Sequence, residues 1–246
     1  MSSQRGIAVY RLLSPAGLDQ RLACGYAARP MVRNPVPILP ILYVDQHIVV
    51  ADKPAGLLSV PGRGVDKADC LLSRVQAEFD DALAVHRLDM ETSGLIVLAR
   101  GAAMHRKLSM RFEARQVSKA YVAVVAGTMA GPCGEIDLPL IADWPNRPRQ
   151  IVDPIRGKPS LTRWRMLAYD AATHTSRLML EPVTGRSHQL RVHLASLGHP
   201  ILGDSLYASQ AVRLAAPRML LHACMLDLGV AEDGQTPWRF ESPAPF

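Results

Sequence analysis

Short apolar runs separated by turn residues dominate the sequence after residue 37, and they constrain the fold more than any other feature. Runs typical of β-strands cover 41–45, 47–51, 94–99, 121–126, 175–182, 219–228 and 238–240. Helical patterns are confined to 70–79, 102–115 and 188–197. Because strands outnumber helices and do not alternate with them regularly, the sequence predicts an α+β fold with a mainly antiparallel sheet.

Residues 1–36 differ in composition from the rest of the chain. They contain five arginines and a single acidic residue, Asp19, and they end in a proline-rich stretch. Because proline disfavours regular structure, we expect a basic and poorly ordered extension there. It is either inert or touches the phosphates of a nucleic acid, and a transit peptide is a further alternative. Residues 37–246 are expected to form one domain, in which the Pro- and Arg-rich segment 143–159 is an irregular loop.

The charge balance favours a polyanionic partner. The chain has 28 basic and 22 acidic side chains, a net charge of +6 and a pI of about 9.4, and nucleic acid is the commonest partner of such a surface. No apolar run reaches the ~18 residues of a membrane span, and the start lacks the pattern of a secretory signal. We therefore expect a cytoplasmic protein that does not bind membranes.

The cysteines give no sign of a metal site or a disulfide framework. None forms a CxxC pair, so we do not expect a zinc site built from neighbouring residues. We expect the cysteines to be free thiols. The four positions are Cys24, Cys70, Cys133 and Cys224.

One carboxylate stands out in the segment 85–94, VHRLDMETSG. Asp89 follows a basic pair and precedes a tight Thr-Ser-Gly turn into the apolar run at 94–99. Loops anchored on a sheet commonly carry catalytic groups. Spacing alone, however, favours a residue that caps the turn.

A second polar cluster, GRSHQLRVH, covers 185–193. Arg186 and Arg191 lie near the start of the predicted helix, where polar groups from turn and helix can converge, although a solvated basic face fits the pattern as well. A metal site made of His188, His193 and His199 is a further alternative. Their spacing matches no familiar ligand pattern, and no supporting carboxylate is evident.

Longer strings decide between these alternatives. HRLDMETSGLIVLA and GRSHQLRVHLASLGHPILGDSLYA resemble the two long signatures of the RluA family of pseudouridine synthases. Four shorter strings, KPAGLLSVPGRG, SKAYVAVVAG, LPLIADWPNRP and RMLLHA, are similar to further blocks of the family in the expected order. The resemblance covers roughly residues 40 to 246 and implies a mixed sheet with flanking helices and a central RNA-binding cleft.

The resemblance also implies an activity and the residues that carry it. The activity is the isomerisation of a uridine in structured RNA to pseudouridine without a cofactor or metal. Asp89 is expected to be the catalytic aspartate, and Arg191 to pair with it and keep it ionised. Tyr121 is expected to lie against the target base and to help move the proton from its C5.

The remaining implied roles concern RNA. Arg87 is expected to enter the RNA where the target base has been flipped out, and Leu220 to be an apolar neighbour of that base. His86, Arg186 and His188 are expected to contact RNA or base.

The resemblance favours two targets, a 23S rRNA loop and the tRNA anticodon stem-loop. Residues 1–36 are too few for the RNA-binding S4 domain that some relatives carry, so target choice should rest on the catalytic domain of a monomer. Three alternatives stay open: a family member with another rRNA or tRNA target, a non-catalytic RNA-binding or ribosome-assembly protein, and a glycosidase-like enzyme that releases free base. The glycosidase needs water in the site, whereas an isomerase must retain the base and exclude water.

Overall fold

A computed structural model describes residues 39–246 except 63, 65 and 66. The described residues all belong to one unit, Ile38–Phe246. The predicted basic extension, 1–36, lies outside the described residues. In the described part of the chain, no helix is long and apolar enough to cross a membrane.

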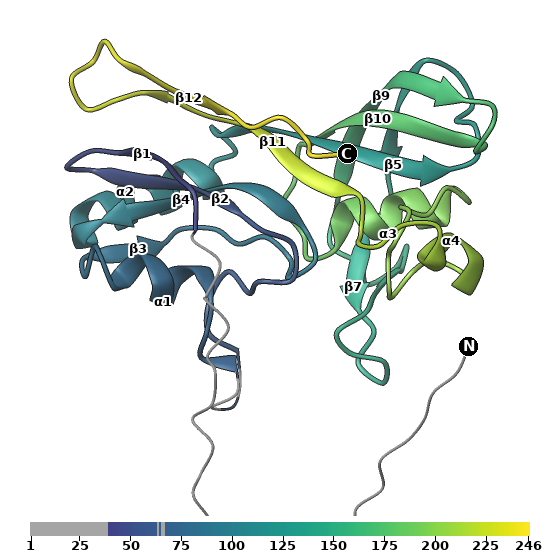
Figure 1. Ribbon diagram of the computed structural model, residues 1–246, viewed down its shortest axis with the longest axis horizontal. Helices are drawn as coiled ribbons and strands as arrows, with labels where there is room; N and C mark the ends of the chain where they lie inside the picture. Colours follow the sequence, from purple (N-terminus) through teal and green to yellow (C-terminus); the bar gives the residue numbers. More distant parts are fainter. Residues whose placement is uncertain (1–38, 63, 65–66) are drawn as a thin grey trace, which may run out of the picture. The chain divides into compact units, whose positions relative to one another are not determined.

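The described strands form one ten-stranded sheet and a separate two-stranded hairpin, β7–β8 (Figure 1). The order in the large sheet is β1-β2-β4-β11-β5-β10-β9-β6, with β3 beside β4 and β12 beside β11. Among these strands only β4 and β11 pair in parallel. The predicted α+β class with a mainly antiparallel mixed sheet is confirmed.

The strands are β1 (Ile41–Val44), β2 (Ile48–Lys53), β3 (Ala82–Ala84), β4 (Ser93–Arg100), β5 (Ser118–Ala126), β6 (Cys133–Asp137), β7 (Leu140–Ala142), β8 (Gln150–Val152), β9 (Leu161–Asp170), β10 (Thr175–Pro182), β11 (Leu221–Val230) and β12 (Pro237–Glu241). The helices are α1 (Leu71–Gln76), α2 (Gly101–Glu113), α3 (Gln189–Ser196) and α4 (Gln210–Leu214).

Strand β4 is buried on both faces, which explains the unbroken apolar run at 94–99. Leu95 and Val97 pack in a cluster with helix α2. Ile96 and Leu98 point the other way, into a cluster with helix α1. Since successive side chains of a strand face opposite sides, a strand between two helices needs apolar residues at every position.

Strand β11 joins two halves of the sheet, with α1 and α2 on one half and α3 on the other (Figure 1). Leu221, at its start, packs in the same cluster as Leu190 and Leu194 of α3. Leu226 and Leu228, further along, pack in the cluster of α2. The strand therefore belongs to both cores and fixes the two halves against each other.

The structure adds elements that the apolar pattern did not predict, among them β3, β6, β7, β8, β9 and α4. The prediction that 143–159 is irregular is wrong in part, because β8 lies in it and pairs with β7, Leu140 opposite Val152. Strand β9 was missed because arginines alternate with its buried residues Thr162 and Trp164. Pairing with distant strands, rather than local composition, defines these elements.

Gly94 lies where β4 and β11 pair, and we expect its replacement by alanine to destabilise the fold. Its φ is +111°, and a Cβ atom there would lie 2.3 Å from the carbonyl oxygen of Ala223. The left-handed backbone costs about 1–2 kcal/mol and the clash about 1–3 kcal/mol more. Urea denaturation of Gly94→Ala should show the summed loss.

Gly229→Ala is the matched control for this prediction. Gly229 has a φ of +82°, but nothing lies within 4 Å of an added Cβ atom. Only the backbone cost of about 1–2 kcal/mol should appear. Equal losses for the two variants would contradict the close approach of β4 and β11.

Candidate active site

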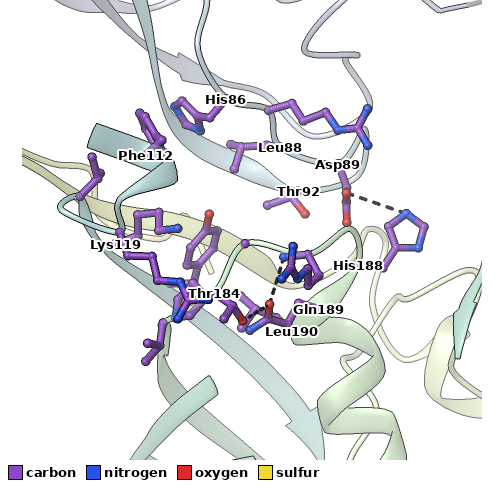
Figure 2. Close-up of a pocket in the computed structure, with 18 of the residues that line it drawn as sticks. His86, Leu88, Asp89, Thr92, Phe112, Lys119, Thr184, His188, Gln189 and Leu190 are labelled. Carbon is purple, nitrogen blue, oxygen red and sulfur yellow. Dashed lines mark hydrogen bonds and ion pairs between the residues drawn. The ribbon is translucent and has the colours of Figure 1, made fainter. Parts of the chain in front are cut away.

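A cleft of about 530 Å³ lies against the central strands β5 and β11 (Figure 2). Three segments surround it: the loop between β3 and β4, the end of α2 with the start of β5, and the turn that leads from β10 into α3. Tyr121 and Leu221 also line it. Groups from distant parts of the chain can therefore meet in one place, as a catalytic site requires.

The loop that carries Asp89 is fixed on both sides of that residue. Ser59 donates to the carbonyl oxygen of Leu88 at 2.7 Å and accepts from its N–H at 3.0 Å. Lys53, which is fully buried, donates to the carbonyl oxygen of Met90 at 3.0 Å. Because both neighbours of Asp89 are held by buried side chains, the backbone at Asp89 is fixed beside the cleft.

Arg191 is the central charge of the site. Only 3% of its side chain is exposed, and it donates to Asp204 through Nε at 2.8 Å and Nη2 at 2.7 Å. Its Nη1 lies 3.4 Å from Oδ2 of Asp89, and its Nη2 lies 3.5 Å from Oε2 of Glu91. The expected contact between Arg191 and Asp89 is present, but Asp204 is the closer partner.

The pKa values of Arg191 and Asp204 are both shifted in the direction that favours the charged form. Burial alone would raise the pKa of Asp204, but the hydrogen bonds and charge of Arg191 outweigh it, and the pKa lies below its usual value. Burial opposes the charge on Arg191, yet Asp204, Asp89 and Glu91 raise the pKa of the guanidinium. Both groups stay charged at neutral pH.

Burial is the largest cause of the pKa shifts of three other groups near the cleft. It raises the pKa of Tyr121, to which the charge of Asp89 adds. It lowers the pKa of Lys53 to about 7, against the opposing effect of Asp89. It also lowers the pKa of His86 to about 3, with a further contribution from the charge of Lys119. Tyr121 and His86 are therefore neutral at neutral pH.

Comparison with known proteins identifies the family. The family model described as RNA pseudouridylate synthase matches residues 47–196. The dual-specificity RNA pseudouridine synthase RluA of Escherichia coli K12 is 51% identical, over 85% of this chain and 95% of its own length. The protein of that name from Yersinia pestis is 48% identical, over 84% and 99%. This chain belongs to the RNA pseudouridine synthase family.

Solved structures agree with the fold of this pseudouridine synthase. Human RNA Pseudouridylate Synthase Domain Containing 1 matches with a TM-score of 0.71 and 29% identity, over 85% of this chain and 84% of that chain. Human RNA Pseudouridylate Synthase Domain Containing 4 matches with a TM-score of 0.67 and 25% identity, over 84% and 88%. The expected family, its fold and its activity, the isomerisation of uridine in RNA, are confirmed.

Most of the predicted site residues of the synthase line the cleft: Arg87, Asp89, Tyr121, Arg186, His188, Arg191 and His86. Arg87 and Arg186 are exposed, and Arg87 donates to Ser187 Oγ at 3.1 Å. His188 is the N-cap residue that precedes helix α3, and its Nε2 lies 3.8 Å from Oδ1 of Asp89.

His86 and Leu220 were expected to contact the RNA or the target base. His86 stacks on Phe112. Its Nε2 accepts a hydrogen bond from the N–H of Val97 at 3.0 Å, so this nitrogen already has a partner within the protein. Leu220 does not line the cleft, whereas Leu221 does. Since neighbouring residues face opposite sides of a strand, an offset of one position moves the apolar contact to the other face.

The alternative metal site does not form. His193 lies between Thr162 Oγ1 and the carbonyl oxygen of Leu138, each at 3.0 Å. His199 contacts the carbonyl oxygen of Ala126, and His188 the hydroxyl of Tyr207. Within the described residues, no group of three His, Cys, Asp or Glu side chains could hold a metal ion.

Sequence reasoning missed Asp204, Tyr207 and Lys119 as parts of the site. Asp204 and Tyr207 lie within the second long signature, GRSHQLRVHLASLGHPILGDSLYA, and Lys119 lies two residues before Tyr121 in SKAYVAVVAG. A charged residue inside such a string indicates a possible member of the site. Its partner, however, is set by the fold rather than by the spacing.

We expect Asp204→Asn to destabilise the synthase strongly. The change removes a charge from a buried ion pair and leaves Arg191 without its closest counter-ion, at a cost of about 3–5 kcal/mol. Thermal or urea denaturation measures it. Glu135→Gln is the control, because Glu135 pairs with Arg163 at 2.8 Å on the exposed surface, where a pair contributes about 0–1 kcal/mol. Similar losses for both variants would contradict the central place of Asp204.

The pair of Arg191 and Asp204 also predicts how the stability of the fold depends on pH in acid. A carboxyl group whose pKa is lowered by folding contributes stability above its unfolded pKa, and that contribution is lost as the pH falls through the folded pKa. The wild type should therefore lose stability below about pH 4. The loss should be shallower in Asp204→Asn, which lacks this titration. Identical slopes in the two proteins would contradict the lowered pKa of Asp204.

Proposed function

We propose that this synthase isomerises a uridine flipped out of an RNA loop into the cleft, with Asp89 as the nucleophile. The observation that carries the proposal is the position of Asp89, which faces the cleft 3.4 Å from the buried guanidinium of Arg191. The positive charge of the guanidinium attracts this carboxylate and orients it.

Other carboxylates of the site are less suited to attack. Asp204 accepts two hydrogen bonds from Arg191 and further ones from the N–H groups of Leu206 and Tyr207. Glu91 accepts from Ser205 Oγ at 2.8 Å and does not line the cleft. Asp89 has only long contacts among the described residues, so its lone pairs are available for the substrate.

The reaction requires one carboxylate and no water. The C1′–N1 bond of the uridine breaks, the base turns and a C1′–C5 bond forms. C5 then loses its proton and N1, released from the sugar, takes one up, so that the product is an isomer of the substrate. A glycosidase would need a second carboxylate to activate water. Since the returning nucleophile is the base itself, the site must hold the base and exclude water.

Tyr121 is proposed to pack against the base beside Asp89. Because its pKa is raised by burial, the hydroxyl is neutral and is a weak base. Tyr121 can accept the C5 proton only while its own proton moves to another group. We therefore assign it a relay function in addition to its packing function.

The lining of the cleft suits an RNA backbone. Four cationic residues line it besides Arg191, namely Arg87, Arg115, Lys119 and Arg186. Flipping a base costs about a few kcal/mol, and we propose that Arg87 fills the vacated space and that the other cations contact phosphates. Unpaired loops are the usual targets of such recognition.

We propose a 23S rRNA loop and the tRNA anticodon stem-loop as targets. The support is the 51% identity to a relative named as a dual-specificity RNA pseudouridine synthase. A cytoplasmic location and a monomer that uses its catalytic domain for target choice complete the proposal.

Release of tritium from uridine C5 tests the proposal, because formation of the C1′–C5 bond must expel that atom. We expect the wild type to release tritium from both a tRNA and a 23S rRNA fragment. Asp89→Asn should reduce release to background from both, because an amide is not a nucleophile of this kind. Glu91→Gln, which changes a neighbouring carboxylate in the same loop, should retain release.

The alternatives predict different results. Release from one RNA alone would remove the dual target and keep the chemistry. Free uracil in place of pseudouridine would indicate a glycosidase. Binding of both RNAs without release would favour a non-catalytic RNA-binding protein or another target.

A further inference from the structure

Tyr207 does not line the cleft, yet its hydroxyl group connects the hairpin β7–β8 to Asp89. The backbone N–H of Gln150, in β8, donates to Oη of Tyr207 at 2.8 Å. The same oxygen lies 2.7 Å from Nδ1 of His188. On the other side of the imidazole ring, Nε2 lies 3.8 Å from Oδ1 of Asp89 (Figure 2).

The backbone N–H of Gln150 favours one direction for these hydrogen bonds. A backbone N–H can only donate, so Tyr207 Oη accepts there. The hydroxyl still has its own proton to donate, and among the described residues Nδ1 of His188 is the acceptor within reach. When Tyr207 donates to Nδ1, that nitrogen carries no proton, and a neutral His188 then carries its proton on Nε2, which faces Asp89.

The surroundings keep His188 neutral. Burial lowers the pKa of the imidazole, and this effect exceeds the opposing charge of Asp89. Arg191 and Arg87 also lower the pKa, and Asp204 raises it. The group that faces Asp89 at neutral pH is therefore an uncharged N–H donor.

The backbone of His188 supports a specific orientation. Its φ and ψ are +54° and 16°, in the left-handed region that residues with a side chain rarely adopt. Such a conformation persists only where neighbouring contacts hold it, and it is common at functional sites. The contact with Tyr207, whose ring meets the imidazole edge-on at 5.7 Å, is one such restraint.

We propose that Tyr207 is a positioning residue that holds His188 as the Nε2–H tautomer, so that this N–H orients Oδ1 of Asp89. The inference rests on the proposed role of Asp89 as the nucleophile. Arg191 faces the other oxygen, Oδ2, at 3.4 Å. The two side chains together define the plane of the carboxylate.

A neutral donor is the suitable partner for this second oxygen. Another cation would withdraw more electron density from the carboxylate and weaken it as a nucleophile, whereas a neutral N–H restricts its rotation without adding charge. The distance of 3.8 Å is longer than a hydrogen bond. Contacts of this kind commonly shorten when the substrate binds.

Nitrogen-15 NMR of the full chain with labelled histidine tests the tautomer directly, since two-bond couplings distinguish the two neutral forms from the imidazolium. We expect His188 in the wild type to carry its proton on Nε2. The loss of its signals in His188→Asn assigns them. A proton on Nδ1, or a mixture of tautomers, would overturn the proposal.

Tyr207→Phe tests the consequence for catalysis. The variant keeps the aromatic ring, which lies 5.3 Å from the guanidinium of Arg149 and 5.2 Å from that of Arg191, and removes only the hydroxyl. We expect mixed tautomers at His188 and a fall in kcat of roughly 10- to 100-fold, because small misplacements of a reacting group have effects of this size. Affinity for RNA should stay within about twofold, because the lost interaction does not contact substrate. An unchanged kcat would overturn the proposal.

Tyr169→Phe is the matched control. The hydroxyl of Tyr169 lies 2.7 Å from Nδ1 of His174, which also has a left-handed backbone, with a φ of +51°. This pair is exposed and does not line the cleft, so kcat should not change. If Asp89→Asn kept full tritium release, the assignment of the nucleophile would fail, whereas the tautomer measurement on the wild type would still stand.

Discussion

The buried guanidinium of Arg191 is the interaction on which the rest of the active site depends. Removing such a charge from water without a partner costs several kcal/mol, and Asp204 offsets this cost with two short hydrogen bonds. Once that pair is formed, Nη1 is directed at Asp89. Since Asp89 precedes β4 and Arg191 lies in α3, the cation connects the loop before β4, in one half of the sheet, to a helix that covers the other half.

The sheet supplies the second half of this arrangement. Gly94 lets β4 approach β11 closely, and β11 packs in the cores of both halves. Lys53 and Ser59 then hold the residues on either side of Asp89. With Asp89 as the proposed nucleophile, this arrangement would need little reorganisation during the reaction.

The sequence predicted local elements well and distant pairings poorly. The run at 94–99 and the strand at 121–126 were recognisable because they are apolar and short. Strand β9 was not recognisable, because its pairing with β10 and β6, rather than its own apolar pattern, defines it.

The same limit applies to the site. Asp89, Tyr121 and Arg191 were assigned through resemblance, and spacing alone left Asp89 as a turn residue and Arg191 on a basic face. Asp204 lies in the same signature as Arg191. Its pairing with Arg191 nevertheless depends on how α3 and the loop after it fold, which the sequence spacing does not show.

A structure of Asp89→Asn bound to an RNA hairpin would show where the target uridine lies. We expect the uridine to be flipped into the cleft, Arg87 to lie in the space it leaves, and the residue at 89 to be about 3–3.5 Å from a reacting atom of the nucleotide. A hairpin bound with its uridine still stacked, or held away from the loop between β3 and β4, would contradict this expectation.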